Sequence, residues 1–282
     1  MFKKKQFKGR ETGKNILILG AVHGDEIAGP LAQQEIIKAI ENEDLVIQKG
    51  EITFIPIVNE QAHLNDTRFI DENLNRVIKH HENPITYEQK IANLLIDEIK
   101  KADVLLDLHS THCPNDKPFA FIDHPTKQNL EFLKSIPVDV ALAGWPEIYQ
   151  HQPNIENNCT EEYAFLNGTD AITLECGFHK APEAVQIAKQ SILNTLAHFE
   201  IIKSEPLSVK EKNIITLKNF IIKEKEGALT KKYTHLDPVK KGEVVALYND
   251  NQPLIAPFDG YIIMPNEKAS IGAEWFYFGK NA

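Results

Sequence analysis

The fold is decided by residues 15–20, Asn15-Ile16-Leu17-Ile18-Leu19-Gly20, which are followed at 23–26 by His23-Gly24-Asp25-Glu26. A continuous apolar run of this length is typical of a strand that is buried on both faces of a parallel sheet. Apolar residues then recur at helical spacing over residues 27–40, so we expect a helix next. The start of the chain therefore predicts a strand, a polar turn and a helix.

The same alternation of strands and helices continues to about residue 199. Apolar runs predict further strands, and amphipathic stretches predict helices, the last of which begins at Pro182. The expected strands are residues 52–58, 103–108, 119–122 and 171–174, and the expected helices are residues 87–101 and 182–199. This order indicates an α/β fold with a mostly parallel sheet and flanking helices.

The pattern changes after residue 203. Short β-rich runs occur at residues 214–222, 243–248, 254–256 and 261–264, and turn signals such as Lys241-Gly242 and Asp259-Gly260 separate them. We therefore expect two domains, a large α/β domain over residues 1–203 and a small β-rich domain over residues 204–282.

The charge balance argues against a nucleic-acid partner. The chain has 282 residues and a net charge of −9, and only three of its 31 cationic residues are arginines, namely Arg10, Arg68 and Arg76. Binding to nucleic acid scales with clustered cations, which an acidic chain with few arginines does not supply.

The chain is expected to be cytoplasmic, with no membrane partner. The longest apolar run near the N-terminus, residues 16–22, is too short to cross a bilayer, and no secretory signal is recognisable. Three cysteines at unrelated spacings, Cys113, Cys159 and Cys176, indicate reduced thiols rather than a disulfide framework.

Residues suited to metal binding or acid–base chemistry follow three of the expected strands. His23 and Glu26 follow the first, His109 follows the strand at 103–108, and Glu175 follows the strand at 171–174. Ligands of open α/β sheets bind beyond the carboxyl ends of the strands, so we expect these residues to share one crevice.

His23, Glu26 and His109 form the predicted metal site. Two ligands close in sequence, a third from a distant strand and an open fourth position for water are typical of catalytic zinc, so we expect one Zn²⁺ per chain. An isolated H-x-x-E is more often a solvated surface pair, and the matching strand ends are what favour a metal here. His112 is the alternative third ligand. His109 is preferred because it directly follows the apolar strand.

The segment from Asn65 to Arg76 contains two of the three arginines. A guanidinium presents a rigid fork to a carboxylate or an oxyanion, which the ammonium of lysine cannot reproduce. This favours a geometric role for Arg68 and Arg76. The ordinary alternative is a salt-bridge loop with Asp66, Asp71 and Glu72.

Taken in order, these residues resemble the succinylglutamate desuccinylase/aspartoacylase family, a branch of the zinc carboxypeptidase-like fold. The matching residues are His23-Gly24-Asp25-Glu26, Arg68, Asn75-Arg76, His109 and Glu175. The resemblance covers essentially the whole chain, since residues 239–266 are also similar to the family's small β domain, which partly covers the active site.

The resemblance implies a zinc hydrolase catalytic domain over residues 1–203 and a capping domain over residues 204–282. It implies that Glu175 is the catalytic carboxylate and that Arg68 polarises the substrate carbonyl. It also implies a clamp for a substrate carboxylate, made of Asn75 and Arg76, and a set of zinc ligands, made of His23, Glu26 and His109.

One departure from the family bears on the substrate. Aspartoacylase holds its acidic amino-acid substrate with a further arginine some ten residues before the catalytic glutamate, and Phe165 stands at that offset here. No Lys or Arg occurs between Ser135 and His179. We therefore expect a zinc-dependent hydrolase that cleaves the amide bond of a small N-acyl amino acid or related amide, with one carboxylate and a neutral or basic remainder.

Two other functions fit the same residues. A metallocarboxypeptidase acting on short peptides would use the same metal chemistry, and a non-catalytic small-molecule binding protein would keep the scaffold. A β domain that restricts access by long peptides favours the deacylase, and the intact set of metal ligands with Glu175 favours an enzyme. The expected partner is a small-molecule substrate with a carboxylate, and the sequence is also compatible with a homo-oligomer.

Overall fold

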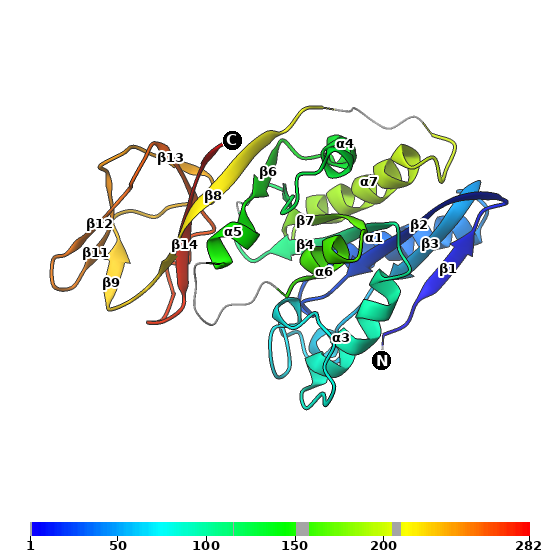
Figure 1. Cartoon of the computed structure of the whole chain (residues 1–282), viewed down its shortest axis with the longest axis horizontal. Helices are drawn as coiled ribbons and strands as arrows, with labels where there is room; N and C mark the ends of the chain where they lie inside the picture. The colour runs from blue at the N-terminus through cyan, green and yellow to red at the C-terminus, as the bar shows by residue number, and fades with distance from the viewer. Residues whose placement is uncertain (1, 115, 151–157, 205–209) are drawn as a thin grey trace. The chain divides into compact units, whose positions relative to one another are not determined.

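Two apolar strands lie at the centre of the sheet (Figure 1). The computed structural model describes residues 2–114, 116–150, 158–204 and 210–282. Strands β2 (Glu11–Gly20) and β4 (Val104–Thr111) pair in parallel, with Ile16 opposite Val104 and Gly20 opposite Leu108. Their apolar side chains are buried, as expected of strands that are covered on both faces.

The other elements before residue 212 continue the alternation. The strands are β1 (Lys5–Lys8), β3 (Lys49–Ile55), β5 (Phe119–Phe121), β6 (Val140–Ala143) and β7 (Asp170–Phe178). The helices are α1 (Ala28–Glu41), α2 (Glu60–Leu64), α3 (Tyr87–Ile99), α4 (Lys127–Ser135), α6 (Thr160–Leu166) and α7 (Pro182–His198), with a 3-10 turn η1 (Leu74–Arg76).

The sheet has a parallel centre. The first six of its eleven strands follow the order β1-β3-β2-β4-β7-β5. Strands β3, β2, β4 and β7 pair in parallel, whereas β1 and β5 pair antiparallel with β3 and β7. Helices α3 and α6 pack on one set of apolar side chains, which includes Leu17 and Leu105, and α1 packs against α7 and contacts β4. The predicted α/β fold with a mostly parallel sheet and flanking helices is confirmed.

Two strands are longer than predicted. Strand β4 continues through His109, and β7 continues through Glu175, so both residues lie within strands rather than after them. They are direct partners in the parallel pairing of β4 with β7. The ladder is made by backbone groups, so it extends past the point where the apolar side chains stop.

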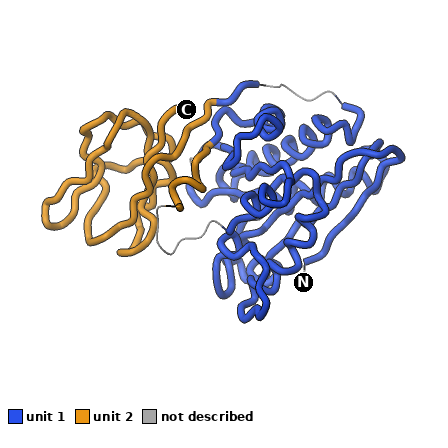
Figure 2. The backbone as a smooth tube through the Cα atoms, in the orientation of Figure 1, with its two compact units in different colours: residues 1–141, 156–212 blue, residues 142–155, 213–282 orange. Residues whose placement is uncertain are grey.

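The chain divides into two compact units (Figure 2). The first consists of Met1–Ala141 and Glu156–Lys212, and the second consists of Leu142–Ile155 and Asn213–Ala282. The second unit therefore takes in residues 142–155, which the sequence places in the first domain. A boundary at residue 203 between a catalytic and a capping domain stays a prediction.

The second unit consists mainly of antiparallel strands. Strands β8 (Asn213–Ile222), β14 (Glu274–Asn281), β13 (Gly260–Ile263) and β10 (Asp237–Val239) pair in that order. Strands β12 (Pro253–Ile255), β11 (Val244–Tyr248) and β9 (Gly227–Leu229) form a small sheet of their own, and helix α5 is Trp145–Tyr149. Aromatic side chains such as Trp275, Phe276 and Tyr248 fill the core of this unit. The expected small β unit is confirmed, and strand β14 is an addition to the predicted runs.

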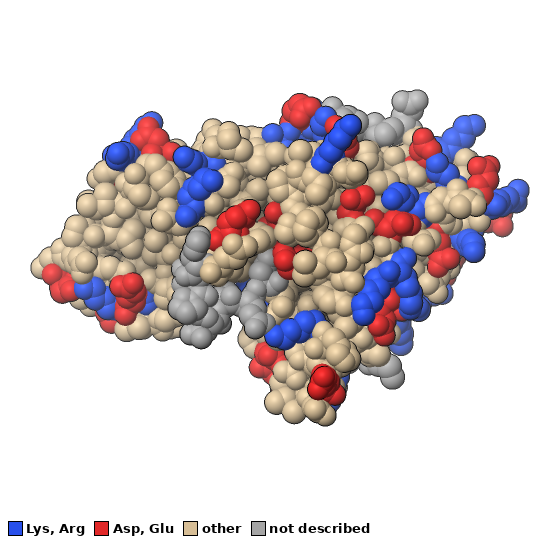
Figure 3. Space-filling model, in the orientation of Figure 1, with Lys and Arg blue, Asp and Glu red and all other residues tan. Residues whose placement is uncertain are grey.

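Charged side chains of both signs are interspersed on the surface. On the face drawn in Figure 3, the Lys and Arg side chains of the described residues lie among Asp and Glu side chains and form no continuous basic patch. Among the ion pairs of the chain are Lys4 with Glu98 and Lys189 with Glu35. Across the described ranges, no helix is both long enough and apolar enough to cross a membrane.

Gly24 lies where the turn after β2 passes the backbone of α2, and this contact predicts the effect of a substitution. A Cβ atom at Gly24 would lie 2.3 Å from Ala62 C and His63 N. Both atoms belong to the backbone and cannot rotate away. Gly24→Ala should therefore lower the free energy of unfolding by about 3 kcal/mol, at the upper end of the usual cost of overpacking.

Denaturant unfolding measures this effect, and Gly168→Ala is the matched control. No atom lies within 4 Å of a Cβ at Gly168, whose φ is +78°. The control should lose only the penalty of a left-handed backbone, about 1 kcal/mol. Equal losses in the two variants would show that contact with α2 does not restrict residue 24.

Candidate metal centre and active site

His23 and Glu26 lie in the turn between β2 and α1. Ala21 has a φ of 45°, in the left-handed region that residues other than glycine seldom adopt, and the chain leaves the sheet there. The backbone N–H of Asn59 donates to the carbonyl of Ala21 at 3.0 Å. The turn that carries the two side chains is thus anchored to the segment after β3.

The structure brings His23, Glu26 and His109 together. His23 Nδ1 lies 2.8 Å from Glu26 Oε1, and His109 Nδ1 lies 2.9 Å from Glu26 Oε2. The two Nδ1 atoms are 3.2 Å apart. One ligand atom from each residue lies within 4.8 Å of the others, and all three side chains are buried. These residues could hold a metal ion.

The far nitrogens of both imidazoles are fixed as donors. His23 Nε2 lies 3.0 Å from Asn73 Oδ1, which also accepts the backbone N–H of Asn75. His109 Nε2 lies 3.0 Å from Asp107 Oδ2. Because both partners are acceptors, each Nε2 carries a proton, and in the neutral, metal-binding form of the two imidazoles both Nδ1 lone pairs face the carboxylate of Glu26. Lone pairs that face one another repel unless a cation lies between them, so this donor set fits a metal ion.

The electrostatics of the centre favour a cation. Burial, followed by the charge of Arg68, lowers the pKa of His23 to about 4, which keeps this imidazole neutral. Burial opposes ionisation of Glu26, but His23 and His109 outweigh it and hold the pKa of the carboxyl well below its usual range. Burial would likewise lower the pKa of His109, but Asp107 and Glu26 raise it well above the usual value. The carboxylates of Asp107 and Glu26 therefore favour a positive charge beside His109.

Arg68 reaches the centre from the segment after α2. Its Nη1 donates to Glu26 Oε1 at 3.1 Å, and its side chain remains 40% exposed. The other oxygen of the same carboxylate accepts the backbone N–H of Ser110 at 3.1 Å. Arg68 therefore contacts a predicted metal ligand directly, while part of its guanidinium stays accessible.

Glu175 lies beside His109 on the neighbouring strand. Its Oε2 is buried and has no hydrogen-bond partner in the part of the chain that the structure describes. Burial, and after it the charge of Glu26, raise the pKa of Glu175 to about 8. A carboxyl group with a pKa near neutrality can take up and release a proton in one reaction cycle.

Asn75 and Arg76 lie in η1, close to the start of α6. Asn75 Oδ1 accepts the backbone N–H of Thr160 at 3.0 Å. Arg76 Nη1 donates to the carbonyl of Asn75 at 3.0 Å. The two residues of the predicted carboxylate clamp are thus adjacent, and the orientation of the Asn75 side chain is fixed by α6.

His112, the alternative third ligand, belongs to a different group. Its Nε2 lies 3.4 Å from Asp25 Oδ2, and half of its side chain is exposed. The ligand atoms of His112, Asp25 and Glu26 also lie close enough to hold an ion. The ring of His112 packs edge-on against the buried ring of His179. The buried group that contains His23 is completed by His109 and not by His112.

Three side chains at the centre had no role in the sequence prediction, namely Asn73, Asp107 and Thr160. Thr160 donates its hydroxyl to Asp107 Oδ2 at 2.6 Å, and Asn73 and Asp107 bind the two imidazoles. The sequence contained a signal for Asp107, because residues i and i+2 of a strand point to the same face and His109 follows two residues later. Thr160 is 53 residues from Asp107 and has no local signal.

Phe165 stands where the family resemblance would place a further arginine. Its ring stacks on the ring of His124, with 3.6 Å between the ring centres. His124 Nε2 lies 2.7 Å from Glu162 Oε2, and Glu162 also belongs to α6. This helix therefore presents an aromatic ring and carboxylates, with no lysine or arginine in its sequence.

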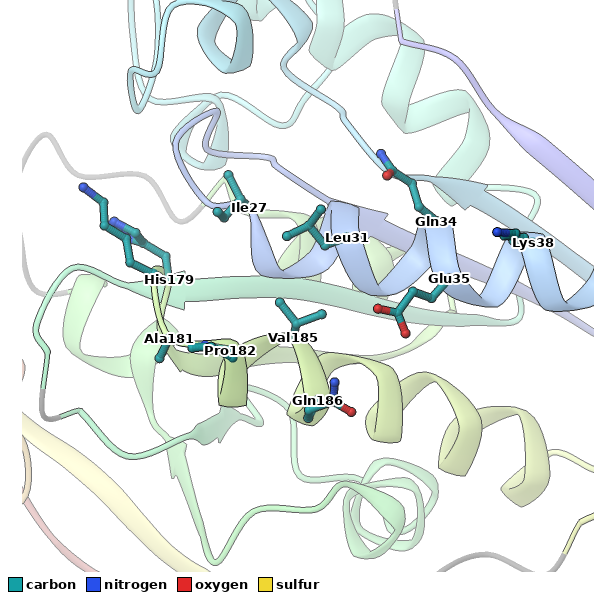
Figure 4. A pocket seen from close by; sticks show the side chains of 11 residues that line it. Ile27, Leu31, Gln34, Glu35, Lys38, His179, Ala181, Pro182, Val185 and Gln186 are labelled. Carbon is teal, nitrogen blue, oxygen red and sulfur yellow. The ribbon is translucent and has the colours of Figure 1, made fainter.

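A hollow of about 560 Å³ lies between α1 and α7, as Figure 4 shows. Ile27 and Leu31 line one side, and Pro182 and Val185 line the other. None of the three clustered ligands lines this hollow, although Ile27 directly follows Glu26. It is separate from the candidate metal centre.

Comparison with known proteins finds relatives of this chain in sequence and in fold. Succinylglutamate desuccinylase from Shewanella denitrificans is 25% identical to this chain, over 93% of the chain and 80% of its own length. A succinylglutamate desuccinylase/aspartoacylase structure from Rhodobacter sphaeroides matches with a TM-score of 0.79 at 18% identity, over 100% of this chain and 90% of that one. The product-bound ectoine utilization protein EutE (DoeB) from Ruegeria pomeroyi matches with a TM-score of 0.77 at 22% identity, over 98% of this chain and 88% of that one.

At these identities the two solved structures establish a shared fold. The family itself is established by sequence, because the family model of the succinylglutamate desuccinylase/aspartoacylase catalytic domain matches residues 12–198, more than half of the chain. This chain belongs to the succinylglutamate desuccinylase/aspartoacylase family.

Proposed function

We propose that this chain is a zinc-dependent hydrolase that cleaves the amide bond of a small N-acyl amino acid or a related amide. Membership of a deacylase family supports the reaction class. The observation that carries the proposal is the convergence of His23, Glu26 and His109, with Glu175 opposite His109 on the next strand. Two imidazoles and a carboxylate with an open fourth position are a donor set of catalytic zinc.

Zinc held by these three side chains would supply a Lewis acid for the scissile carbonyl and a bound water of lowered pKa. The protein contributes the orientation of the ligands. Asn73 and Asp107 accept the Nε2 protons of the two imidazoles, which fixes the direction of each Nδ1 lone pair and raises its basicity.

Glu175 is the proposed general base and general acid. In its ionised form it accepts a proton from the attacking water, and it then donates that proton to the amine nitrogen as the C–N bond breaks. The lone Oε2 atom and the raised pKa support this role, because the carboxyl group is not neutralised by a fixed partner at that oxygen.

Arg68, Asn75 and Arg76 are proposed to bind the substrate. The half-exposed guanidinium of Arg68 places a fixed positive charge beside Glu26, where it would stabilise negative charge that develops on the carbonyl oxygen. Arg76 and the amide of Asn75 would bind the substrate carboxylate, since a guanidinium fork matches the two oxygens of that group.

The proposed substrate has one carboxylate and a neutral or basic remainder. A second carboxylate would need a second cation, and helix α6 offers Phe165, Glu161 and Glu162 instead. Burial raises the pKa of Glu161 to about 7, and helix α6 itself contains no lysine or arginine. Four other expectations from the sequence also remain proposals. They are a cytoplasmic location, the absence of nucleic-acid and membrane partners, a homo-oligomer, and a capping role for residues 204–282.

The first test concerns the metal. The full chain should bind one zinc ion, and chelation should abolish hydrolysis until zinc is restored. His109→Ala should lose metal binding, because it removes one of three ligands, whereas His112→Ala should retain it. Metal analysis of the two purified variants measures the difference. Loss of zinc from His112→Ala with retention in His109→Ala would reverse the ligand assignment.

The second test concerns Glu175. Glu175→Gln keeps the shape of the side chain but cannot accept a proton, so turnover should fall by roughly 10²–10⁴-fold, the usual contribution of a general base. Zinc content should stay at one ion per chain. Glu35→Gln, a charge removal at an exposed ion pair with Lys189, should retain wild-type turnover. A wild-type rate for Glu175→Gln would rule out the proposed mechanism.

The third test concerns the substrate. Steady-state assays should show higher kcat/KM for N-acetylated amino acids with neutral or basic side chains than for N-acetylaspartate and N-succinylglutamate, because the additional carboxylates of the latter two meet no lysine or arginine on α6. Strong turnover of N-acetylaspartate with weak turnover of the monocarboxylates would overturn the substrate class. Preferential release of C-terminal residues from longer peptides would identify a carboxypeptidase, and zinc binding without any turnover would identify a binding protein.

A further inference from the structure

Hydrogen bonds join the metal centre and the predicted carboxylate clamp into a closed ring. On one side of the ring, His23 Nε2 binds Asn73 Oδ1, which accepts the backbone N–H of Asn75 at 2.9 Å. On the other side, His109 Nε2 binds Asp107 Oδ2, which accepts the hydroxyl of Thr160. The N–H of Thr160 closes the ring on Asn75 Oδ1. The two imidazoles meet at Glu26.

We propose that Thr160 is a positioning residue that orients both a metal ligand, His109, and a residue of the substrate clamp, Asn75. The role of the clamp in this inference rests on the proposed function. The hydroxyl of Thr160 acts on His109 through Asp107, and the N–H of Thr160 acts on Asn75. Thr160 itself is fully buried and needs no contact with the substrate to do this.

The hydroxyl of Thr160 is one of two donors that hold a buried carboxylate. Asp107 is 0% exposed, and its Oδ1 has no hydrogen-bond partner among the residues that the structure describes. Its Oδ2 carries both bonds, one from Thr160 at 2.6 Å and one from His109 at 3.0 Å. Loss of the hydroxyl would leave His109 as the one side-chain donor to Asp107 among the described residues. Partners of this kind fix the ring orientation and the basicity of a metal-binding histidine.

The N–H of Thr160 decides which way the amide of Asn75 points. An N–H can only donate, so the atom of Asn75 that lies 3.0 Å from it must be the carbonyl oxygen. The NH₂ group of Asn75 therefore projects from the opposite side of the amide, as a donor suited to a carboxylate. This N–H is free for the task because Thr160 is the first residue of α6, where backbone donors have no partner within the helix.

Thr160→Val tests the hydroxyl arm. Valine keeps the branched shape and the backbone N–H but removes the hydroxyl. The dissociation constant for zinc, measured by competition with a chelator on the full chain, should rise about 10-fold, within the range found for partners of metal-binding histidines. The turnover number should fall while KM stays within about twofold of wild type, because the N–H arm is intact. Thr160→Ser restores the hydroxyl and should return the zinc dissociation constant to within about twofold of wild type.

Thr169→Val is the matched control, because the hydroxyl of Thr169 is also buried and donates to a backbone carbonyl, that of Ala102. Like Thr160→Val, it removes a buried hydrogen bond and should lower the unfolding midpoint, but it should leave zinc affinity unchanged. Zinc affinity of Thr160→Val equal to that of wild type, or failure of Thr160→Ser to restore it, would overturn the hydroxyl arm. These readouts use zinc alone, so they stand even if no N-acyl amino acid is hydrolysed and the proposed function fails.

Asn75→Asp tests the N–H arm. Aspartate keeps an acceptor for the N–H of Thr160 but places a negative oxygen where the NH₂ group projects. KM for the best N-acyl amino acid should rise at least about 10-fold, as expected when a hydrogen bond to a charged group is replaced by repulsion. An unchanged KM in Asn75→Asp would overturn the assigned orientation of the amide. If the wild-type chain hydrolyses no N-acyl amino acid, that result would instead contradict the proposed function.

Discussion

A carboxylate buried between two imidazoles is the interaction on which the rest of the centre depends. Glu26 is 2% exposed, and a charge removed from water in this way needs partners on every side. The structure supplies the guanidinium of Arg68, the backbone N–H of Ser110 and the two histidines. These partners come from the turn after β2, the segment after α2 and strand β4, so the centre exists only in the folded chain and any metal bound there stabilises that fold.

The sequence predicted those parts of the fold and the site that local patterns determine. The apolar strands around Leu17 and Leu105, and the placement of His23, Glu26 and His109 near them, follow from periodicity and strand order. The full lengths of β4 and β7 did not follow, because the ladder is made by backbone groups and continues through polar residues. The roles of Asn73 and Thr160 did not follow either, since each depends on a partner far away in the chain. Asp107 did have a local signal, because His109 follows it by two residues on the same strand.

Arg68 and the lysines of this protein form ion pairs in different surroundings. Arg68 is paired with a buried carboxylate at the centre, whereas lysines such as Lys4 and Lys189 pair with glutamates at partly or largely exposed positions. Exposed pairs of that kind contribute little to stability. Two of the three arginines, Arg68 and Arg76, lie in one short segment of the chain.

The pairing of His109 with Glu175 has a consequence for how such a centre changes over evolutionary time. Neighbouring strands are about 4.8 Å apart, a distance that is set by peptide hydrogen bonds and not by side chains. The two residues are partners across such a pair of strands, so the interval between them is inherited with the sheet. Helices and loops around the sheet can exchange residues freely without altering that interval. Substrate preference can therefore drift while His109 and Glu175, the proposed metal ligand and general base, keep their places.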